Sequence, residues 1–384
     1  MPWINYSTRR LPLNPEPLNT EVLRGVETPA GVVDLAKARA NAERVVAYCH
    51  KHGISWRPHV KTHKSRTIAR MQLDVGAIGL TVATPREAEV MATVTDDILI
   101  AYPVVGEAKL RRLMTLPERT DLKIALDSTE VLAGVSASAQ DAGRTVGVLV
   151  EIDVGLGRVG LPGVAEAVEL AERVRAASAV QYRGILFYPG QIRQPGPAQS
   201  DALRIVSEQL EGLYAELAER DLQPEIVSGG STPTLWRSHD MAGVTEIRSG
   251  TAIYFDREGW ALGIAEHEHL AYTVVASIVS TAVPGQAVVD AGSKALSKED
   301  RAGEGFAVLY DHPEVVVKGL SEEHGVLDLT HTDWRPQVGE IVRIIPNHTC
   351  VSVNLQDSLL GWDGAELTPV LLEGRGRGGF EAPE

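Results

Sequence analysis

The stretch DLKIALDSTEVLAGVSASAQDAGRTVGVLVEID, residues 121–153, has the pattern of a strand, a helix and a second strand. Its two ends, 121–127 and 145–153, are short apolar runs, and the residues between them form an amphipathic, alanine-rich segment. A helix that joins two consecutive strands of one sheet leaves them parallel, through a right-handed crossover. The stretch therefore predicts one β-α-β unit of an α/β fold.

The same rhythm extends in both directions along the chain. Nine candidate strands can be marked, and they cover residues 29–34, 54–60, 77–83, 96–102, 121–127, 145–153, 180–188, 224–230 and 246–254. So many consecutive units favour a closed (β/α)8 TIM-type barrel over an open sheet. Nine strands exceed that number by one, so either the first belongs elsewhere or one has been miscounted.

The rhythm changes after about residue 265. Short apolar runs such as QAVVDAG, FAVLY and EIVRIIPNH follow one another with turns and almost no helical pattern. This part predicts a separate, C-terminal all-β domain. The last stretch, EGRGRGGFEAPE (373–384), is rich in glycine and predicts a flexible tail.

Composition excludes several classes of partner. The chain of 384 residues has a formal net charge of −14, which disfavours nucleic acid and anionic membrane surfaces. No run approaches the roughly 18 apolar residues that a membrane span needs. Two cysteines, far apart in the sequence, indicate a reducing compartment rather than a disulfide framework. We expect a cytoplasmic protein with a small-molecule substrate.

The end of the second candidate strand is strongly basic. RPHVKTHK, residues 57–64, contains Arg57, His59, Lys61, His63 and Lys64. In a barrel the active site lies at the carboxyl ends of the strands, and neighbouring cations lower the pKa of a lysine. A neutral Lys61 could form a Schiff base with an aldehyde cofactor. Strand alternation puts Lys61 on the face of Arg57 and His59, while Lys64 remains a second candidate; a solvated basic loop is the alternative.

Two glycine-rich turns follow the last two candidate strands. SGGST (228–232) and RSGT (248–251) could offer backbone N–H groups and hydroxyls to a phosphate, which barrels often hold at late strands. Either turn alone could be an ordinary strand–helix connection. Together with a Schiff-base lysine they indicate pyridoxal phosphate.

GLGRVG, residues 155–160, matches the dinucleotide-binding pattern G-x-G-x-x-G. It follows the sixth candidate strand rather than the first, and charged residues interrupt the strand before it. We therefore interpret Asp153 and Arg158 as site residues and do not predict a nicotinamide or flavin site.

In the β domain, PNHTC (346–350) places His348 and Cys350 two residues apart, on one face if the segment is a strand. An imidazole and a thiolate are a plausible zinc pair, and two ligands leave an open, catalytic type of site. A histidine beside a buried cysteine by coincidence is the alternative.

Six segments together resemble the D-serine dehydratase and D-threonine aldolase family, fold-type III pyridoxal phosphate enzymes with an alanine racemase-like barrel. They run in the family's order over nearly the whole chain: RPHVKTHK (57–64), EIDVGLGRVG (151–160), SGGSTPT (228–234), EIRSGTAIYFD (246–256), DAGSKALS (290–297) and PNHTCVSVNL (346–355). The resemblance implies a cofactor barrel over residues 26–265. Residues 1–25 and 266–384 would form the β-rich domain that carries the metal ligands, with the first candidate strand packed against it.

The resemblance also implies roles for single residues. Lys61 would be the Schiff-base lysine, and we take Lys61, His59 and Arg158 as the catalytic residues. Arg158 would approach the phenolic oxygen of the cofactor, and either Tyr188 or Arg248 would face the ring nitrogen. The phosphate contacts match Ser231, Thr232, Gly250 and Thr251, and the divalent metal ligands match His348 and Cys350. The active sites of the family lie near a dimer interface, which implies a homodimer.

The implied activity is that of a lyase on D-3-hydroxy amino acids such as D-serine, D-threonine or 3-hydroxy-D-aspartate. Family members that dehydrate tend to carry cysteine at the Cys350 position, and members that cleave aldols tend to carry aspartate. A thiolate favours Zn²⁺, whereas an aspartate would favour Mn²⁺ or Mg²⁺. We therefore favour a dehydratase, with an aldolase as the alternative. An amino-acid racemase has no need of the metal pair, and a non-catalytic pyridoxal phosphate carrier has no need of the β domain.

Overall fold

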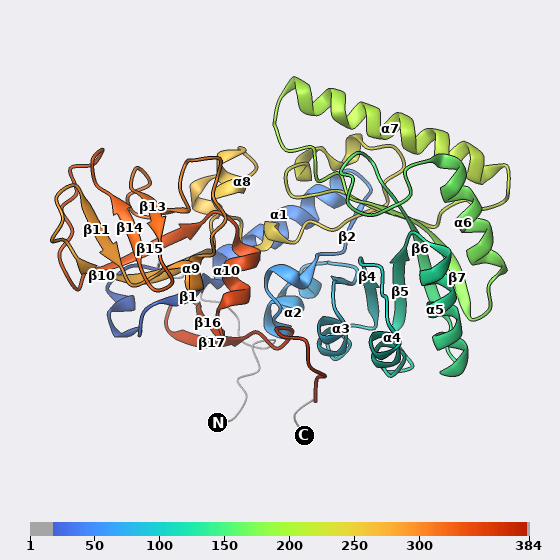
Figure 1. Ribbon diagram of the computed structural model, residues 1–384, viewed down its shortest axis with the longest axis horizontal. Coiled ribbons are helices and arrows are strands. Elements are labelled where there is room, and N and C mark those ends of the chain that lie inside the picture. The colour runs from blue at the N-terminus through green and yellow to red at the C-terminus, as the bar shows by residue number, and fades with distance from the viewer. Residues whose placement is uncertain (1–17, 382–384) are drawn as a thin grey trace. The chain divides into compact units, whose positions relative to one another are not determined.

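The computed structural model describes residues 18–381. This part of the chain divides into two compact units, which we call the barrel unit (43–250 and 373–381) and the sheet unit (18–42 and 251–372). Figure 1 shows parallel strands flanked by helices in the first and a twisted, mainly antiparallel sheet in the second. No helix in the described part of the chain is both long and apolar enough to cross a membrane.

Eight strands form the sheet of the barrel unit, and every neighbouring pair is parallel. They are β2 (Ser55–Trp56), β3 (Leu80–Val82), β4 (Asp97–Ile100), β5 (Asp121–Leu126), β6 (Val146–Ile152), β7 (Val180–Phe187), β8 (Ile226–Gly229) and β9 (Glu246–Ile247). The sheet order runs β2-β9-β8-β7-β6-β5-β4-β3, and a parallel bridge between His59 and Thr81 joins its two ends. The predicted TIM-type barrel is confirmed.

Helices connect consecutive strands and lie side by side around the sheet (Figure 1). They are α1 (Leu35–Lys51), which passes from one unit into the other, α2 (Arg66–Asp74), α3 (Pro85–Met91), α4 (Glu107–Met114), α5 (Thr129–Asp141), α6 (Val164–Ala176) and α7 (Pro197–Ala218). Two 3₁₀ helices, η3 (Val60–Thr62) and η4 (Leu235–Asp240), follow β2 and β8. The start of α3 illustrates how local sequence fixes a helix end. The Thr84 side chain caps the helix by accepting the Glu87 N–H, and Pro85 is the first helical residue.

The interior of the barrel is closed by apolar side chains from consecutive strands. Leu99, Ala125, Leu149, Leu186 and Ile226, one from each strand from β4 to β8, form a single buried cluster. Since every second residue of a strand faces the same side, these five define which residues of each strand point inward.

The sheet unit contains a nine-stranded sheet and short helices. The strands are β1 (Ala30–Asp34), β10 (Tyr272–Ser280), β11 (Gln286–Val289), β12 (Ala307–Leu309), β13 (Val316–Leu320), β14 (Gly325–Asp328), β15 (Ile341–Pro346), β16 (Ser358–Trp362) and β17 (Leu367–Leu371). The helices are η2 (Val22–Gly25), η5 (Thr251–Ile253), α8 (Arg257–Ala261), η6 (His267–His269), α9 (Ser293–Leu296) and α10 (Thr349–Leu355). β1 pairs antiparallel with β10 and parallel with β16, so the expectation that the first strand joins the β domain is confirmed.

The two units divide the chain at other residues than the predicted boundaries. Residues 26–42 and 251–265 group with the sheet unit, and the C-terminal segment groups with the barrel unit. That segment is held: Gly374 N donates to Lys64 O at 2.8 Å, and Phe380 lies 4.8 Å beneath the Arg86 guanidinium. The prediction of a flexible tail is therefore wrong for residues 373–381. Of the predicted segments, residues 1–17 and 382–384 lie outside the described part of the chain.

Candidate active site

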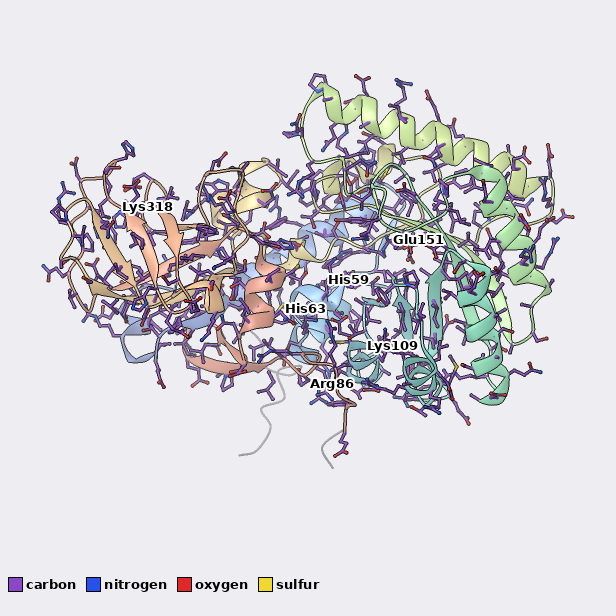
Figure 2. All side chains as sticks on the ribbon, in the orientation of Figure 1. His59, His63, Arg86, Lys109, Glu151 and Lys318 are labelled. Atoms are coloured by element: carbon purple, nitrogen blue, oxygen red, sulfur yellow. The ribbon has the colours of Figure 1, made fainter. Side chains whose placement is uncertain are left out.

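Polar side chains from several strands meet inside the barrel, at the carboxyl ends of its strands. Glu151 lies two residues beyond the interior Leu149 on β6, so its side chain faces inward as well. Arg248, just after β9, donates from its guanidinium to the Ser228 hydroxyl at 2.7 Å. Figure 2 labels Glu151 and His59 in this unit. A barrel enzyme places its reactive groups at this end.

Much of the positive charge of RPHVKTHK is compensated within the barrel. Arg57 is 2 % exposed, and its Nε donates to both carboxylate oxygens of Glu246, at 3.0 and 2.9 Å. Arg57 also pairs with Asp97. Burial lowers the pKa of His63 to about 3, so its ring is neutral beside Gln72. The hypothesis that all these cations surround Lys61 is therefore wrong for Arg57 and His63.

The two candidate lysines have different environments. Lys64 is 8 % exposed, and its ammonium lies 2.5 Å from a carboxylate oxygen of the fully buried Glu87. The other Glu87 oxygen accepts the Ala83 N–H at 2.7 Å, so Lys64 completes the shell of a buried anion. Lys61 is exposed, and no partner for its side chain occurs among residues 18–381. Lys61 is the amine that remains available to a ligand.

The backbone around Lys61 departs from the predicted strand. β2 ends at Trp56, and η3 begins at Val60, so the alternation argument for Lys61 is wrong. His59 instead caps η3, because its Nδ1 accepts the Lys61 N–H at 3.3 Å. Burial first, and then the charges of Lys61 and Arg248, hold the pKa of His59 well below its usual value. His59 is thus a neutral imidazole that is hydrogen-bonded to the backbone of Lys61.

The two glycine-rich turns bring backbone close to other groups. A Cβ on Gly250 would lie 2.5 Å from the carbonyl oxygen of His59, and one on Gly229 would lie 2.3 Å from the Phe187 ring. Only glycine fits such approaches. The two glycines are therefore required by close packing within the barrel, and a phosphate contact at these turns stays a prediction.

The hydroxyls of these turns are used in different ways. Ser231 is 2 % exposed, and its Oγ lies 3.0 Å from Thr234 Oγ1, within its own turn. Thr232 is half-buried. Thr251 belongs to the sheet unit, where its hydroxyl lies 3.7 Å from the Cys350 sulfur. Of the predicted phosphate residues, only Ser231, Thr232 and Gly250 lie in the barrel unit.

The backbone N–H groups at the start of GLGRVG already donate hydrogen bonds to a carboxylate of the protein. Asp153 accepts the N–H groups of Gly155, Leu156 and Gly157 at 3.0 to 3.2 Å. An anion in the position of a pyrophosphate would compete with that carboxylate. Arg158, in the same loop, lies over the Tyr188 ring at 5.1 Å. The motif therefore shapes a loop that includes Arg158, and the interpretation of Asp153 and Arg158 as site residues stays a prediction.

Arg248 and Glu151 have opposite charges in the barrel interior. Burial lowers the pKa of Arg248 to about 10, against the opposing effect of Glu151. Burial likewise raises the pKa of Glu151 to about 7, although Arg248 acts to lower it. Glu151 is 3 % exposed, and its Oε2 has no hydrogen-bond partner in the described structure. Sequence reasoning missed this carboxyl, which can change its charge near neutral pH.

The predicted metal pair lies at the start of a helix in the sheet unit. His348 is the N-cap of α10 and Cys350 is its second residue, so the prediction that they share the face of a strand is wrong. The pKa of His348 is raised to about 12, first by the charge of the neighbouring Cys350 sulfur and then by the hydrogen bond that its ring donates to Asp256. One nitrogen and one sulfur donor favour a borderline metal such as Zn²⁺. No cluster of three or more acidic, histidine or cysteine ligands occurs in residues 18–381, so other ligands would have to complete the shell.

Asp256 orients this pair and was not singled out from the sequence. Its Oδ2 lies 3.0 Å from His348 Nδ1 and accepts the Thr349 N–H at 3.1 Å, while Oδ1 accepts the Gly259 N–H at 3.0 Å. Asp256 therefore caps both α8 and α10 and leaves the other nitrogen of His348 for a metal. A carboxylate behind a ligating histidine is a common arrangement in metal sites. The aspartate before a helix start was the signal in the sequence.

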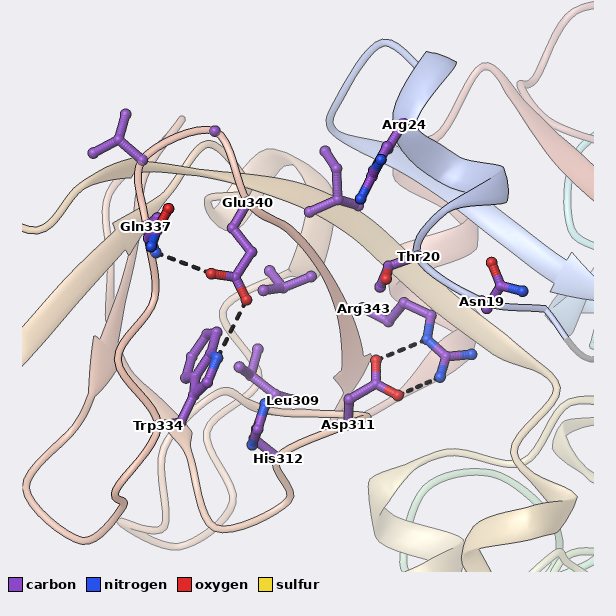
Figure 3. Close-up of a pocket in the computed structure, with 14 residues that line it drawn as sticks. Asn19, Thr20, Arg24, Leu309, Asp311, His312, Trp334, Gln337, Glu340 and Arg343 are labelled. Atoms are coloured by element: carbon purple, nitrogen blue, oxygen red, sulfur yellow. Dashed lines mark hydrogen bonds and ion pairs between the residues drawn. The ribbon is translucent and has the colours of Figure 1, made fainter.

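A separate cavity of about 820 Å³ opens in the sheet unit beside β15 (Figure 3). Its charged and aromatic groups pair with each other: Glu340 accepts from Trp334 Nε1 at 3.2 Å, and Arg343 forms an ion pair with Asp311. Because these partners satisfy one another, the cavity contains no evident reactive group.

Comparison with known proteins agrees with this geometry. Residues 33–258 match the family described as alanine racemase, N-terminal domain, and residues 271–362 match a putative serine dehydratase domain. The D-threonine aldolase of Arthrobacter sp. is 29 % identical, over 92 % of this chain and 93 % of its own. The D-threo-3-hydroxyaspartate dehydratase of Delftia sp. (strain HT23) is 30 % identical, over 86 % of this chain and 93 % of its own.

A solved structure extends the likeness to three dimensions. D-threonine aldolase from Filomicrobium marinum superposes with a TM-score of 0.85 and 28 % identity, over 92 % of this chain and 97 % of its own. Barrel, lysine and β domain thus define a fold-type III pyridoxal phosphate enzyme, of the alanine racemase-like kind. Within that class the chain belongs to the D-serine dehydratase and D-threonine aldolase family of lyases.

The barrel unit fits pyridoxal phosphate on its own structure. Lys61 offers an exposed amine, and the buried Arg248 guanidinium supplies positive charge.

Proposed function

We propose that the protein is a pyridoxal phosphate- and divalent-metal-dependent dehydratase of D-3-hydroxy amino acids. It would convert D-serine, D-threonine or 3-hydroxy-D-aspartate into a keto acid and ammonia. The observation that carries the proposal is the His348–Cys350 pair, oriented by Asp256. A metal is of use on a substrate with a β-hydroxyl, since a Lewis acid stabilises the departing hydroxide.

The proposed cofactor contacts lie around Lys61 and the glycine-rich turns. We assign them to Lys61, Arg158, Tyr188, Ser231, Thr232, Arg248, Gly250 and Thr251. When bound, the cofactor supplies an electron sink for the α-carbon of the substrate. Lys61 would hold the cofactor aldehyde in the resting enzyme and, once released, take the α-proton. His59, neutral and hydrogen-bonded to the Lys61 backbone, would fix the position of that amine.

The proposed metal is Zn²⁺ on His348 and Cys350, with Mn²⁺ and Mg²⁺ as less favoured occupants. A related solved structure supports a metal in this family, because it is a mutant of D-threo-3-hydroxyaspartate dehydratase in the metal-free form. The fit on this chain rests on its soft donor pair and on the Asp256 carboxylate behind His348.

An aldolase is the second candidate, and relatives with this activity support it as well as others support the dehydratase. A 3-hydroxy-D-aspartate aldolase of Paracoccus denitrificans is as similar to the chain, at 30 % identity, as the Delftia dehydratase. In this alternative a base removes the β-hydroxyl proton, the Cα–Cβ bond breaks, and glycine and an aldehyde form. A racemase or a non-catalytic carrier is less favoured, because neither uses the metal pair.

We also propose a cytoplasmic homodimer that binds neither nucleic acid nor membranes. The net charge of −14 supports the last part, through repulsion of polyanions. Light scattering coupled to size-exclusion chromatography tests the dimer, and a monomer at micromolar concentration would contradict it.

The dehydratase proposal is tested by a matched substrate pair. With pyridoxal phosphate and Zn²⁺ supplied, D-serine should yield pyruvate and ammonia, whereas D-alanine, which lacks the β-hydroxyl, should yield neither. Chelation should abolish the reaction, and Zn²⁺ should restore it. Full activity after exhaustive chelation would refute the role of the metal.

A further inference from the structure

Glu151 is a buried carboxyl on a strand whose other residues are mostly apolar. It lies on β6, whose residues are all buried, and is 3 % exposed. Its register partner on β7 is Leu186, which belongs to the interior cluster with Leu149. Both relations place the Glu151 carboxyl inside the barrel, one layer beyond the apolar cluster and toward the open end.

The Oε2 atom of Glu151 has no hydrogen-bond partner in the described structure. An unpaired buried carboxyl oxygen destabilises the folded state, so such groups usually have a function or a ligand. Three charged groups act on it: Asp127 at the end of β5, Arg158 in the loop after β6, and Arg248 after β9. All are side chains at the end of the barrel where the cofactor site is proposed.

Arg248 needs a counter-charge that its hydrogen bonds do not provide. Its guanidinium donates to the Ser228 hydroxyl at 2.7 Å and to the Phe187 carbonyl at 2.8 Å, and both acceptors are neutral. Glu151 is the carboxylate that most strongly opposes the effect of burial on Arg248. Glu246 acts on Arg248 less strongly and is already paired with Arg57. The charge state of Glu151 therefore changes the net charge of this buried layer by one unit.

We propose that Glu151 is a positioning residue for the cofactor, because it faces the same interior space as Arg248 and sets the net charge that the cofactor meets there. The inference rests on the proposed cofactor site but not on the choice between dehydratase and aldolase. With its proton, Glu151 no longer offsets the Arg248 charge, and only the weaker effect of Glu246 remains, which favours an anionic ligand. Without its proton, Glu151 adds a negative charge to the layer and weakens binding. The pKa of about 7 makes the change fall within the working range of most enzymes.

The test is the affinity of the metal-free apoprotein for pyridoxal phosphate as a function of pH, measured from the visible absorption of the bound cofactor. Glu151→Gln fixes the neutral form without changing the shape of the side chain, and Glu151→Asp keeps a titrating carboxyl. Glu211→Gln, an exposed position on α7, is the matched control.

At pH 6 the parent and Glu151→Gln proteins should bind the cofactor alike. At pH 8.5 Glu151→Gln should bind roughly tenfold more tightly than the parent, because only the parent gains a carboxylate. Glu151→Asp should retain a pH-dependent ratio, and Glu211→Gln should follow the parent throughout. If the ratio of the cofactor affinities of Glu151→Gln and the parent stayed constant from pH 6 to 8.5, the inference about Glu151 would be overturned, while the proposed cofactor site would stand. Failure of the parent to bind the cofactor at any pH would overturn the proposed site as well.

Discussion

The Lys64 ammonium lies 2.5 Å from a carboxylate oxygen of the fully buried Glu87. Lys61, three residues earlier, is exposed. Two lysines of one short motif thus have separate tasks, since one neutralises a buried anion and the other remains free. The residues alone left both lysines as candidates for the Schiff base, and the family resemblance favoured Lys61.

Replacing each lysine by alanine should separate these tasks. Lys61→Ala should have the same thermal unfolding temperature as the parent. It should form no covalent link to the cofactor and should lose turnover. Lys64→Ala should lose about 3 to 5 kcal/mol of unfolding free energy, because it leaves Glu87 buried and unpaired. Borohydride reduction followed by peptide mass spectrometry checks the link, and thermal unfolding checks the stability. A reduced cofactor found on Lys64 would contradict the assignment.

Replacing Asp256 should weaken metal binding without removing a ligand. In Asp256→Asn an amide N–H would replace one of the acceptors that serve His348 and the two helix starts. Loss of such a supporting carboxylate typically costs 10- to 100-fold in metal affinity, and we expect a loss of about this size. Competition with a chromogenic chelator measures it, with the exposed Asp333→Asn as the control. Unchanged zinc affinity in Asp256→Asn would show that Asp256 serves only the helix starts.

Changing the soft ligand should change the preferred metal. Cys350→Asp replaces a sulfur donor by an oxygen donor, which should reduce the preference for Zn²⁺ and raise that for Mn²⁺. Metal analysis after dialysis against equimolar Zn²⁺ and Mn²⁺ gives the ratio. Cys49→Ala, a buried change in the other unit, should leave the ratio as it is. If Cys350→Asp and the parent load the same metals in the same ratio, Cys350 is not a ligand.

Glu151 should lower the free energy of unfolding as pH rises above about 4.5, with the full loss reached above about pH 7. Its pKa is raised from 4.5 to about 7, so the folded state holds a proton that the unfolded state releases above pH 4.5. Stability should therefore fall as pH rises from about 4.5 to 7, and the full loss should persist above that window. The shift corresponds to about 3 kcal/mol. Denaturant unfolding at pH 5 and pH 8 should show Glu151→Gln more stable than the parent only at pH 8, and equal stability at pH 8 would contradict this.

The hydrophobic pattern of the sequence was sufficient to predict the fold class. Apolar runs such as 145–153 mark strands because burial on both faces leaves a continuous hydrophobic signal, and their repetition predicted the barrel. The RPHVKTHK stretch also lies at a strand end, where a barrel places its active site. Pattern was less reliable at that end, because η3 replaces the strand after Trp56 and alternation no longer applies.

Other features could not be predicted because they depend on residues far apart in the sequence. Asp256 acquires its role from His348, 92 positions away, and the C-terminal segment is fixed by Lys64 and Arg86. Glu151 interrupts an apolar strand, which marks it as unusual. Its position opposite Arg248 follows only from the closure of the barrel.

The product formed from D-threonine tests the central claim most directly. The parent protein, supplied with pyridoxal phosphate and either Zn²⁺ or Mn²⁺, would be incubated with D-threonine and its products identified by mass spectrometry. Dehydration predicts 2-oxobutanoate and ammonia, in agreement with a thiolate ligand that favours elimination. Glycine and acetaldehyde instead would contradict the dehydratase and establish the aldolase. The cysteine at position 350 would then not predict which reaction the protein catalyses.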